Sequence, residues 1–199
     1  MEKAMLKIAR RYRIGGKAVV LGLLTLVRCS ETNSLETGIS TPAKENVNIL
    51  KFANTGLSLA KKATLSKMIV AEVGGSLSFL FPDGGPGEDA MLAVTLTVPP
   101  GSLSQDTEIS LSFDGESLDF EFQPDGTYFS QPARLDVDAN GVSLAGVNFQ
   151  NISLFYNNKE QRNWEPMRMD SVIITENAGR LQLTNARIPH FSRYVLAEE

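Results

Sequence analysis

The chain has 199 residues, 42% hydrophobic and 21% charged, which is typical of a globular protein with one domain and an additional segment. Its net charge of −4 is uneven: seven of the 19 Lys and Arg residues lie in the first 28 positions, whereas residues 30–199 carry 12 basic and 22 acidic side chains. This acidic surface argues against nucleic-acid binding, and the single cysteine excludes both an intramolecular disulfide and a multi-cysteine zinc site.

Residues 1–29 predict an export signal. A ten-residue apolar stretch, AVVLGLLTLV at positions 18–27, follows a basic stretch. A helix that crosses a bilayer needs about 20 apolar residues, so this segment is typical of the apolar region of a signal peptide. The basic residues before it are Lys3, Lys7, Arg10, Arg11, Arg13 and Lys17.

The end of this segment, Leu26-Val27-Arg28-Cys29, resembles the lipobox of bacterial lipoproteins. That resemblance implies that Cys29 becomes the lipid-modified first residue of the mature chain and anchors it to a membrane. Arg28 departs from the family, which has a small residue at that position. We therefore expect a bacterial cell-envelope protein, anchored at the outer membrane or cell surface; cleavage after Cys29 would instead give a secreted or periplasmic protein.

Residues 30–62 predict a flexible tether. They are rich in Ser, Thr, Asn and Lys, and no apolar period of 2 or 3.6 persists. Such a segment buries too little apolar surface to offset the entropy of ordering it. The only element we consider within it is a short helix between positions 47 and 59.

Residues 63–199 predict an all-β domain, an antiparallel β-sandwich. Apolar and polar residues alternate within positions 94–98, 109–113 and 118–122, the period of half-buried strands. Further candidate strands cover 68–73, 77–81, 135–137, 152–156, 172–175, 181–184 and 191–197. Turn motifs such as Pro99-Pro100-Gly101 and Pro124-Asp125-Gly126 separate them, so we expect nine or ten short strands.

Several landmarks occur in a recognisable order. VTLTVPPGSLSQDTEISLSF at 94–113 and FQPDGTYFSQPARLDV at 122–137 precede Trp164-Glu165 and the closing HFSRYVL. This set resembles the ZU-five domain, the β-sandwich of ankyrins, netrin receptors and many bacterial envelope proteins, from about residue 63 to 199. The loop at 83–89 is longer than the family pattern, and no second domain follows the last strand.

The resemblance implies a non-enzymatic module that binds a protein partner or has a structural role, without a cofactor. The identity of the partner is not implied, because no contact residues can be matched. A carbohydrate-binding module is an alternative. The only tryptophan, Trp164, is either an exposed anchor for a ligand or a residue packed on the sandwich, and the family favours packing.

The triplet His190-Phe191-Ser192 gives a second alternative, because some eukaryotic relatives cleave themselves between Phe and Ser of this triplet. The serine oxygen attacks the preceding carbonyl, an ester forms by an N-to-O acyl shift, and water resolves it. Two residues apart on one strand, His190 and Ser192 would share a face, so the imidazole could act as base. The competing interpretation is a closing strand with Phe191 in the core.

Other polar motifs favour structural roles. The residues of 136–141, DVDANG, match the start of a calcium-binding loop, but position twelve would be Val147 instead of a Glu. Alternation explains them as a strand followed by a turn. The carboxylates Glu88, Asp89, Glu116, Asp119 and Glu121 are expected to be solvated, and we expect no metal site.

Overall fold

The computed structural model describes residues 46–53, 63–81 and 91–199. The predicted signal peptide with Cys29, and residues 30–45 and 54–62 of the predicted tether, lie outside the described residues. The export signal and the lipid anchor therefore stay predictions. Within the described residues, no helix is long and apolar enough to cross a membrane.

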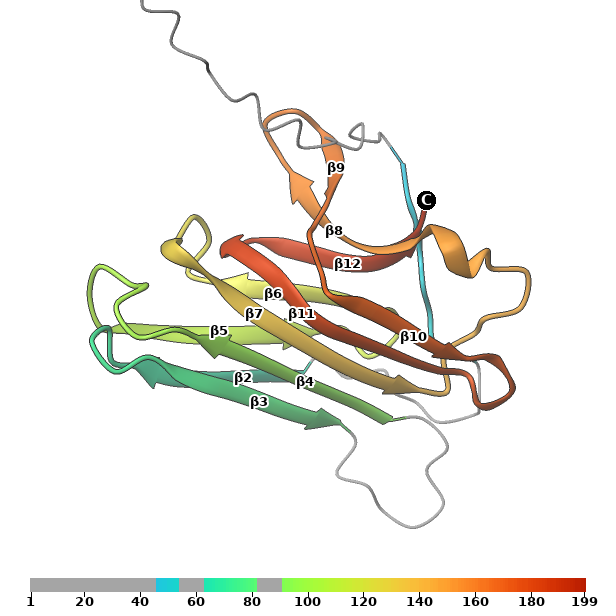
Figure 1. The fold of residues 1–199 in the computed structure, drawn as a ribbon, viewed down its shortest axis with the longest axis horizontal. Coiled ribbons are helices and arrows are strands. Elements are labelled where there is room, and N and C mark those ends of the chain that lie inside the picture. The colour runs from blue at the N-terminus through green and yellow to red at the C-terminus, as the bar shows by residue number, and fades with distance from the viewer. Residues whose placement is uncertain (1–45, 54–62, 82–90) are drawn as a thin grey trace, which may run out of the picture. The chain divides into compact units, whose positions relative to one another are not determined.

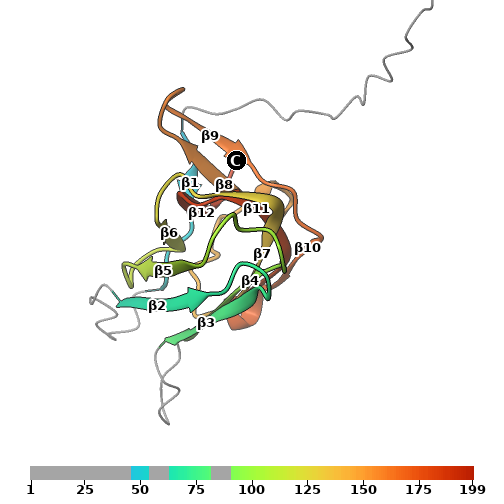
Figure 2. The ribbon, with the colours of Figure 1, turned by 90° about the vertical axis from the view of Figure 1, so that its left-hand side faces the viewer.

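The described residues form two antiparallel sheets, so the predicted all-β sandwich is confirmed (Figures 1 and 2). The first sheet has the order β2 (Ala63–Ile69), β5 (Thr107–Phe113), β6 (Asp119–Gln123), β12 (Arg193–Glu198), β8 (Ile152–Asn158) and β9 (Asn163–Pro166), and β1 (Asn48–Ile49) also pairs with β12. The second has the order β10 (Ser171–Thr175), β11 (Arg180–His190), β7 (Tyr128–Asn140), β4 (Met91–Val98) and β3 (Gly75–Phe81). Two short 3-10 turns, η1 (Phe149–Asn151) and η2 (Glu176–Ala178), complete the described elements.

The predicted alternation of apolar residues builds the core between the sheets. On β4, β5 and β6 every second side chain is buried, and its neighbours lie on the outer faces. Aromatic rings fill the centre, with Phe113 stacked on Phe120 at a centroid distance of 6.2 Å. The buried members of these strands are Leu92, Val94, Leu96, Val98, Ile109, Leu111, Phe113, Phe120 and Phe122.

The segment 46–53 belongs to the sandwich, which corrects the predicted tether and the predicted domain start at residue 63. Leu50 is 2% exposed, donates its N–H to the carbonyl of Leu196 and accepts from the N–H of Leu118. Phe52 packs its ring edge against Phe113 at 6.0 Å. The prediction of a helix between 47 and 59 is wrong at β1, because the backbone groups of this strand are paired with β12.

A glycine allows the chain to pass from β2 to β3. Gly74 has a φ of 69°, and a Cβ there would lie 2.4 Å from the carbonyl oxygen of Val98. A side chain at this position would therefore collide with the end of β4 and also strain the backbone. Gly74 thus permits the crossing from the first sheet to the second.

Two further crossings lie side by side and form a corner of the sandwich. The chain passes from β6 to β7 through residues 124–127, and from β11 to β12 through Phe191 and Ser192. The first crossing runs from the first sheet to the second, and the second crossing runs back to the first sheet. Because β6 pairs with β12 and β7 pairs with β11, the two crossings connect the same pair of neighbouring strands in each sheet. The predicted strand at 191–197 is therefore shifted: β11 ends at His190 and β12 begins at Arg193.

Candidate functional site at the corner between the sheets

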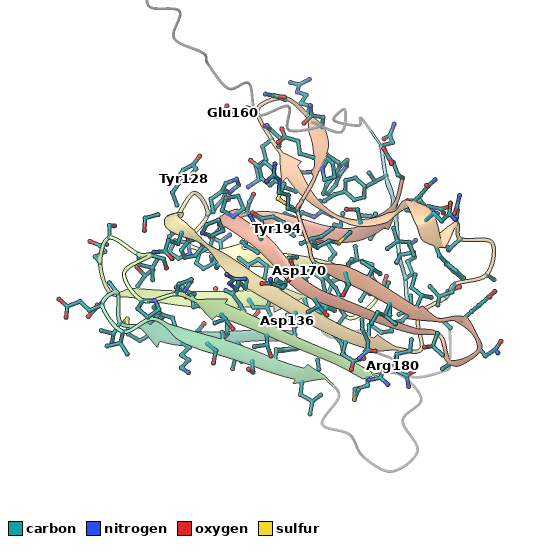
Figure 3. The ribbon with its side chains drawn as sticks, in the orientation of Figure 1. Tyr128, Asp136, Glu160, Asp170, Arg180 and Tyr194 are labelled. Carbon is teal, nitrogen blue, oxygen red and sulfur yellow. The ribbon has the colours of Figure 1, made fainter. Side chains whose placement is uncertain are left out.

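An open pocket of about 440 Å³ lies where this corner meets the hairpin of β8 and β9. Residues of the predicted triplet form its floor, and the β6–β7 crossing forms one wall. The opposite wall comes from the hairpin, which projects from the sandwich in Figure 1. Figure 3 shows Tyr128 and Glu160 at this end of the molecule. We call this feature the corner pocket.

Backbone hydrogen bonds between the two crossings fix the floor of the corner pocket. Gly126 N–H donates to the Phe191 carbonyl oxygen at 3.0 Å, and Phe191 N–H donates to Thr127 O at 2.8 Å. Phe122 N–H donates to the carbonyl oxygen of Ser192 at 3.0 Å. Both backbone groups of Phe191 and the carbonyl of Ser192 are thus paired despite the bend.

Two aromatic side chains anchor this bend to the core. Phe191 is fully buried, stacked on Phe122 at 5.8 Å and in edge contact with Phe129 at 4.9 Å. The buried Tyr194 donates its hydroxyl to the His190 carbonyl oxygen at 2.6 Å. The predicted core position of Phe191 is confirmed, and it holds Ser192 at the base of the corner pocket.

Ser192, Asp125 and Lys159 form a polar chain across the pocket. Lys159 Nζ donates to Asp125 Oδ2 at 2.6 Å, and Ser192 lies beside the same carboxylate. The hydrogen bond from Lys159 is the main cause that lowers the pKa of Asp125, and Ser192 adds to it. The same contact raises the pKa of Lys159, so both groups are charged at neutral pH and join the hairpin to the corner.

His190 contacts two tyrosines. Its ring is 4.5 Å from the ring of Tyr156, edge to face, and 5.2 Å from the ring of Tyr128. Its Nδ1 lies 3.4 Å from the carbonyl oxygen of Phe191, a long contact. The structure therefore places the His190 imidazole near the Phe191 carbonyl oxygen, while Ser192 lies beside the Asp125 carboxylate.

The corner pocket carries an excess of negative charge. Glu165 and Glu160 lie on its hairpin wall, and Asn158 Nδ2 donates to Glu165 Oε1 at 2.7 Å. Burial raises the pKa of Tyr156, and the charges of Glu165, Asp125 and Glu160 raise it further. Three carboxylates thus surround the pocket, and Lys159 is the only cation among the described residues that line it.

Trp164 lies on the outer face of the first sheet. Its half-buried ring packs with Phe155 and Val195, and the Arg193 guanidinium is 5.6 Å from the ring centroid. Arg193 in turn binds both carboxylate oxygens of Asp119. The favoured packing role holds for Trp164, although the ring covers a sheet instead of entering the core between the sheets.

In the structure, the carboxylates of the calcium-like motif at 136–141 make hydrogen bonds within the second sheet. Asp138 binds Arg180 through both carboxylate oxygens, and this hydrogen bonding lowers its pKa. Asp136 accepts the backbone N–H of Asn185 at 2.8 Å. Figure 3 shows Asp136 and Arg180 on the sheet that contains β7 and β11, away from the corner pocket. Over the described ranges, no group of three or more acidic, His or Cys side chains could hold a metal ion.

Glu88 and Asp89 lie outside the described residues, as does Cys29. Sequence alone does not predict Asp125, Tyr156 and Glu165 as neighbours of His190, because they come from three separate connections or strands. A usable signal was the Pro124-Asp125-Gly126 turn, which places an acid at a fixed bend. Comparisons with protein-family models, with curated proteins and with solved structures found no match for this chain.

Proposed function

We propose that this chain is an exported, lipid-anchored bacterial envelope protein whose sandwich, of the ZU-five type, binds another protein through the corner pocket. The observation that carries the binding role is the combination of an exposed aromatic rim with a hydrogen-bonded floor. Tyr128 is 74% exposed at the mouth of the pocket. It is the first residue of β7 and pairs with His190 at the end of β11. Exposed tyrosines on rigid elements are frequent anchors of protein interfaces.

A photo-crosslinking amino acid in place of Tyr128, expressed in the native envelope, tests this proposal. We expect one discrete crosslinked product from position 128. The matched control is the same substitution at Ile173, which is 56% exposed on the edge strand β10. Equal products from both positions, or no product from position 128, would contradict the proposal.

The lipid anchor has its own test, which concerns only residues 1–29. Cells grown with a labelled fatty acid should incorporate the label into the wild-type chain and not into Cys29→Ser. Incorporation that is unaffected by this substitution would contradict the anchor while leaving the binding role of the sandwich open to the crosslinking experiment.

One observation favours self-cleavage as a second candidate function. The Phe191 carbonyl oxygen accepts from Gly126 N–H and faces His190 Nδ1, an arrangement that could stabilise negative charge on that oxygen. The Ser192 hydroxyl could pass its proton to Asp125 as Oγ attacks the Phe191 carbonyl carbon. The C–N bond would break to give an ester and a free amine at Ser192, and water would then release residues 192–199.

Intact mass of the purified chain beginning at residue 30 separates the two candidates. Self-cleavage gives a product that lacks residues 192–199, and both Ser192→Ala and Asp125→Asn should prevent its formation. A single uncut mass eliminates this candidate. We rank it second because neither Phe191 nor Ser192 has a positive φ that would indicate strain at the bond.

A further inference from the structure

We infer that the corner pocket is a subsite for one cationic side chain, an arginine or a lysine, of the partner. This inference rests on the proposed binding function and names the chemistry that the pocket recognises. The first argument is charge. Glu160 and Glu165 face no lining cation of their own, because Lys159, the single cation of the described lining, is bonded to Asp125.

The second argument is the placement of aromatic rings. Tyr128 and Tyr156 both contact the ring of His190, so two phenol rings lie next to the imidazole in the pocket. Tyr128 leaves most of its ring exposed toward solvent at the pocket mouth. A cation over a tyrosine face gains about 0.5–1 kcal/mol at an exposed site and more when it is desolvated.

The third argument is the availability of hydrogen-bond acceptors. Asp125 accepts the hydrogen bond of Lys159 at 2.6 Å, so it is not the principal acceptor for a ligand. Glu165 accepts one bond from Asn158 through Oε1, which fixes the carboxylate and leaves lone pairs on Oε2. A guanidinium or ammonium group between Tyr128 and Glu165 would satisfy both the aromatic and the acidic sides of the pocket.

A neutral sugar would meet the same tyrosines and carboxylates. It would gain nothing from the excess of negative charge, however, whereas a cation is attracted by it over several ångströms. The observations therefore favour the cationic side chain, and sugar binding becomes an outcome of the test.

The experiment uses the full chain in detergent and three acetylated, amidated peptides that differ at one residue. The sequence Gly-Ser-Gly-X-Gly-Ser has arginine, lysine or the neutral isostere citrulline at X, and binding is followed by calorimetry up to about 20 mM peptide. We expect saturable binding of the arginine or lysine peptide that is about tenfold tighter than that of citrulline. Raising the salt concentration should weaken it.

Two variants test the residues. Glu165→Gln removes the negative charge and keeps the shape of the side chain, and Tyr128→Ala removes the aromatic ring. Each substitution should weaken the binding of the arginine peptide about tenfold. Ile173→Ala, on the exposed edge strand, is the control and should bind like the wild type. An unchanged melting temperature shows that each variant is folded.

The inference is overturned if citrulline binds as well as arginine, if neither cationic peptide saturates, or if a panel of neutral saccharides binds and the peptides do not. A crosslink at position 128 together with any of these results would retain the proposed protein binding and reject only the cationic side chain. Absence of that crosslink would reject the proposed function itself.

Discussion

Tyr194 shows how one side chain holds the bend at the corner. Its ring is fully buried, and its hydroxyl donates to the carbonyl oxygen of His190, four residues earlier. Burial raises the pKa of this phenol strongly, because the phenolate would lose its solvation. The un-ionised form is therefore favoured by the folded state.

Tyr194→Phe should cost about 1 kcal/mol of the free energy of unfolding at pH 7, because the His190 carbonyl loses its buried donor. Because the pKa of the phenol is raised in the folded state, its contribution to the free energy of unfolding is fully present below the unfolded pKa of about 10. That contribution is lost as the pH rises above this value, because the unfolded state then releases the proton first. Urea unfolding at pH 7 and at pH 10.5 should thus show a smaller alkaline loss in the variant. An identical alkaline loss in both proteins would contradict this role for Tyr194.

For Asp138 we expect the opposite pH dependence, a loss of stability in acid. Its pKa is lowered by Arg180, so its contribution is present above the unfolded pKa of about 3.9 and disappears as the pH falls through the folded value. The pair is partly exposed, so Asp138→Asn should cost only about 0.5 kcal/mol at pH 7, and the difference should shrink below pH 4. Glu108→Gln, at an exposed position on β5, is the control for urea unfolding at both pH values.

At the scale of elements, β1 is the strand that the composition of the sequence did not predict. The segment supplies only two ladder positions to β12, too few to produce a visible alternation. Its place is instead decided by Leu50 and Phe52, which fill gaps in a core made by strands far away in the sequence.

Leu50→Ala should lower the free energy of unfolding by about 3 kcal/mol, the usual range for a fully buried leucine. Its exposed neighbour Asn48, changed to Ala, should alter it by less than about 0.5 kcal/mol. Chemical denaturation of both variants measures the difference. Equal, small effects would mean that residues 46–53 do not pack in solution.

The other strands were largely predictable, because alternation in β4, β5 and β6 directly encodes which side chains face the core. The corner was not. The types of His190, Phe191 and Ser192, polar, apolar and polar, are those of a continuing strand, yet Phe191 and Ser192 are both buried. Only their backbone hydrogen bonds to the neighbouring crossing at 124–127 show that the chain changes sheets there. A pocket whose walls come from three connections depends on tertiary pairing, which periodicity does not report.

At the scale of the whole molecule, strand pairing joins distant parts of the chain. Asn48 and Glu198, paired between β1 and β12, are 150 positions apart. Such topologies fold slowly, because long loops must close before the contacts form.

We therefore expect the sandwich to refold in milliseconds to seconds, more slowly than a helical bundle of similar size. Trp164, the only tryptophan, packs against β8 and β12 and gives a fluorescence signal for stopped-flow refolding. Equilibrium unfolding followed by Trp164 and by circular dichroism should coincide, because a single core cluster contains residues of both sheets. Separate transitions would show that the sheets unfold independently.

The pairing of β1 with β12 also has a topological consequence. Because Asn48 lies opposite Glu198, the first and last described strands are neighbours in one sheet (Figure 1). A short peptide joining residue 199 to residue 46 would close the backbone into a ring without displacing a strand. The sandwich should therefore tolerate circular permutation, with new termini opened at the η2 turn between β10 and β11, far from the corner that carries the pocket.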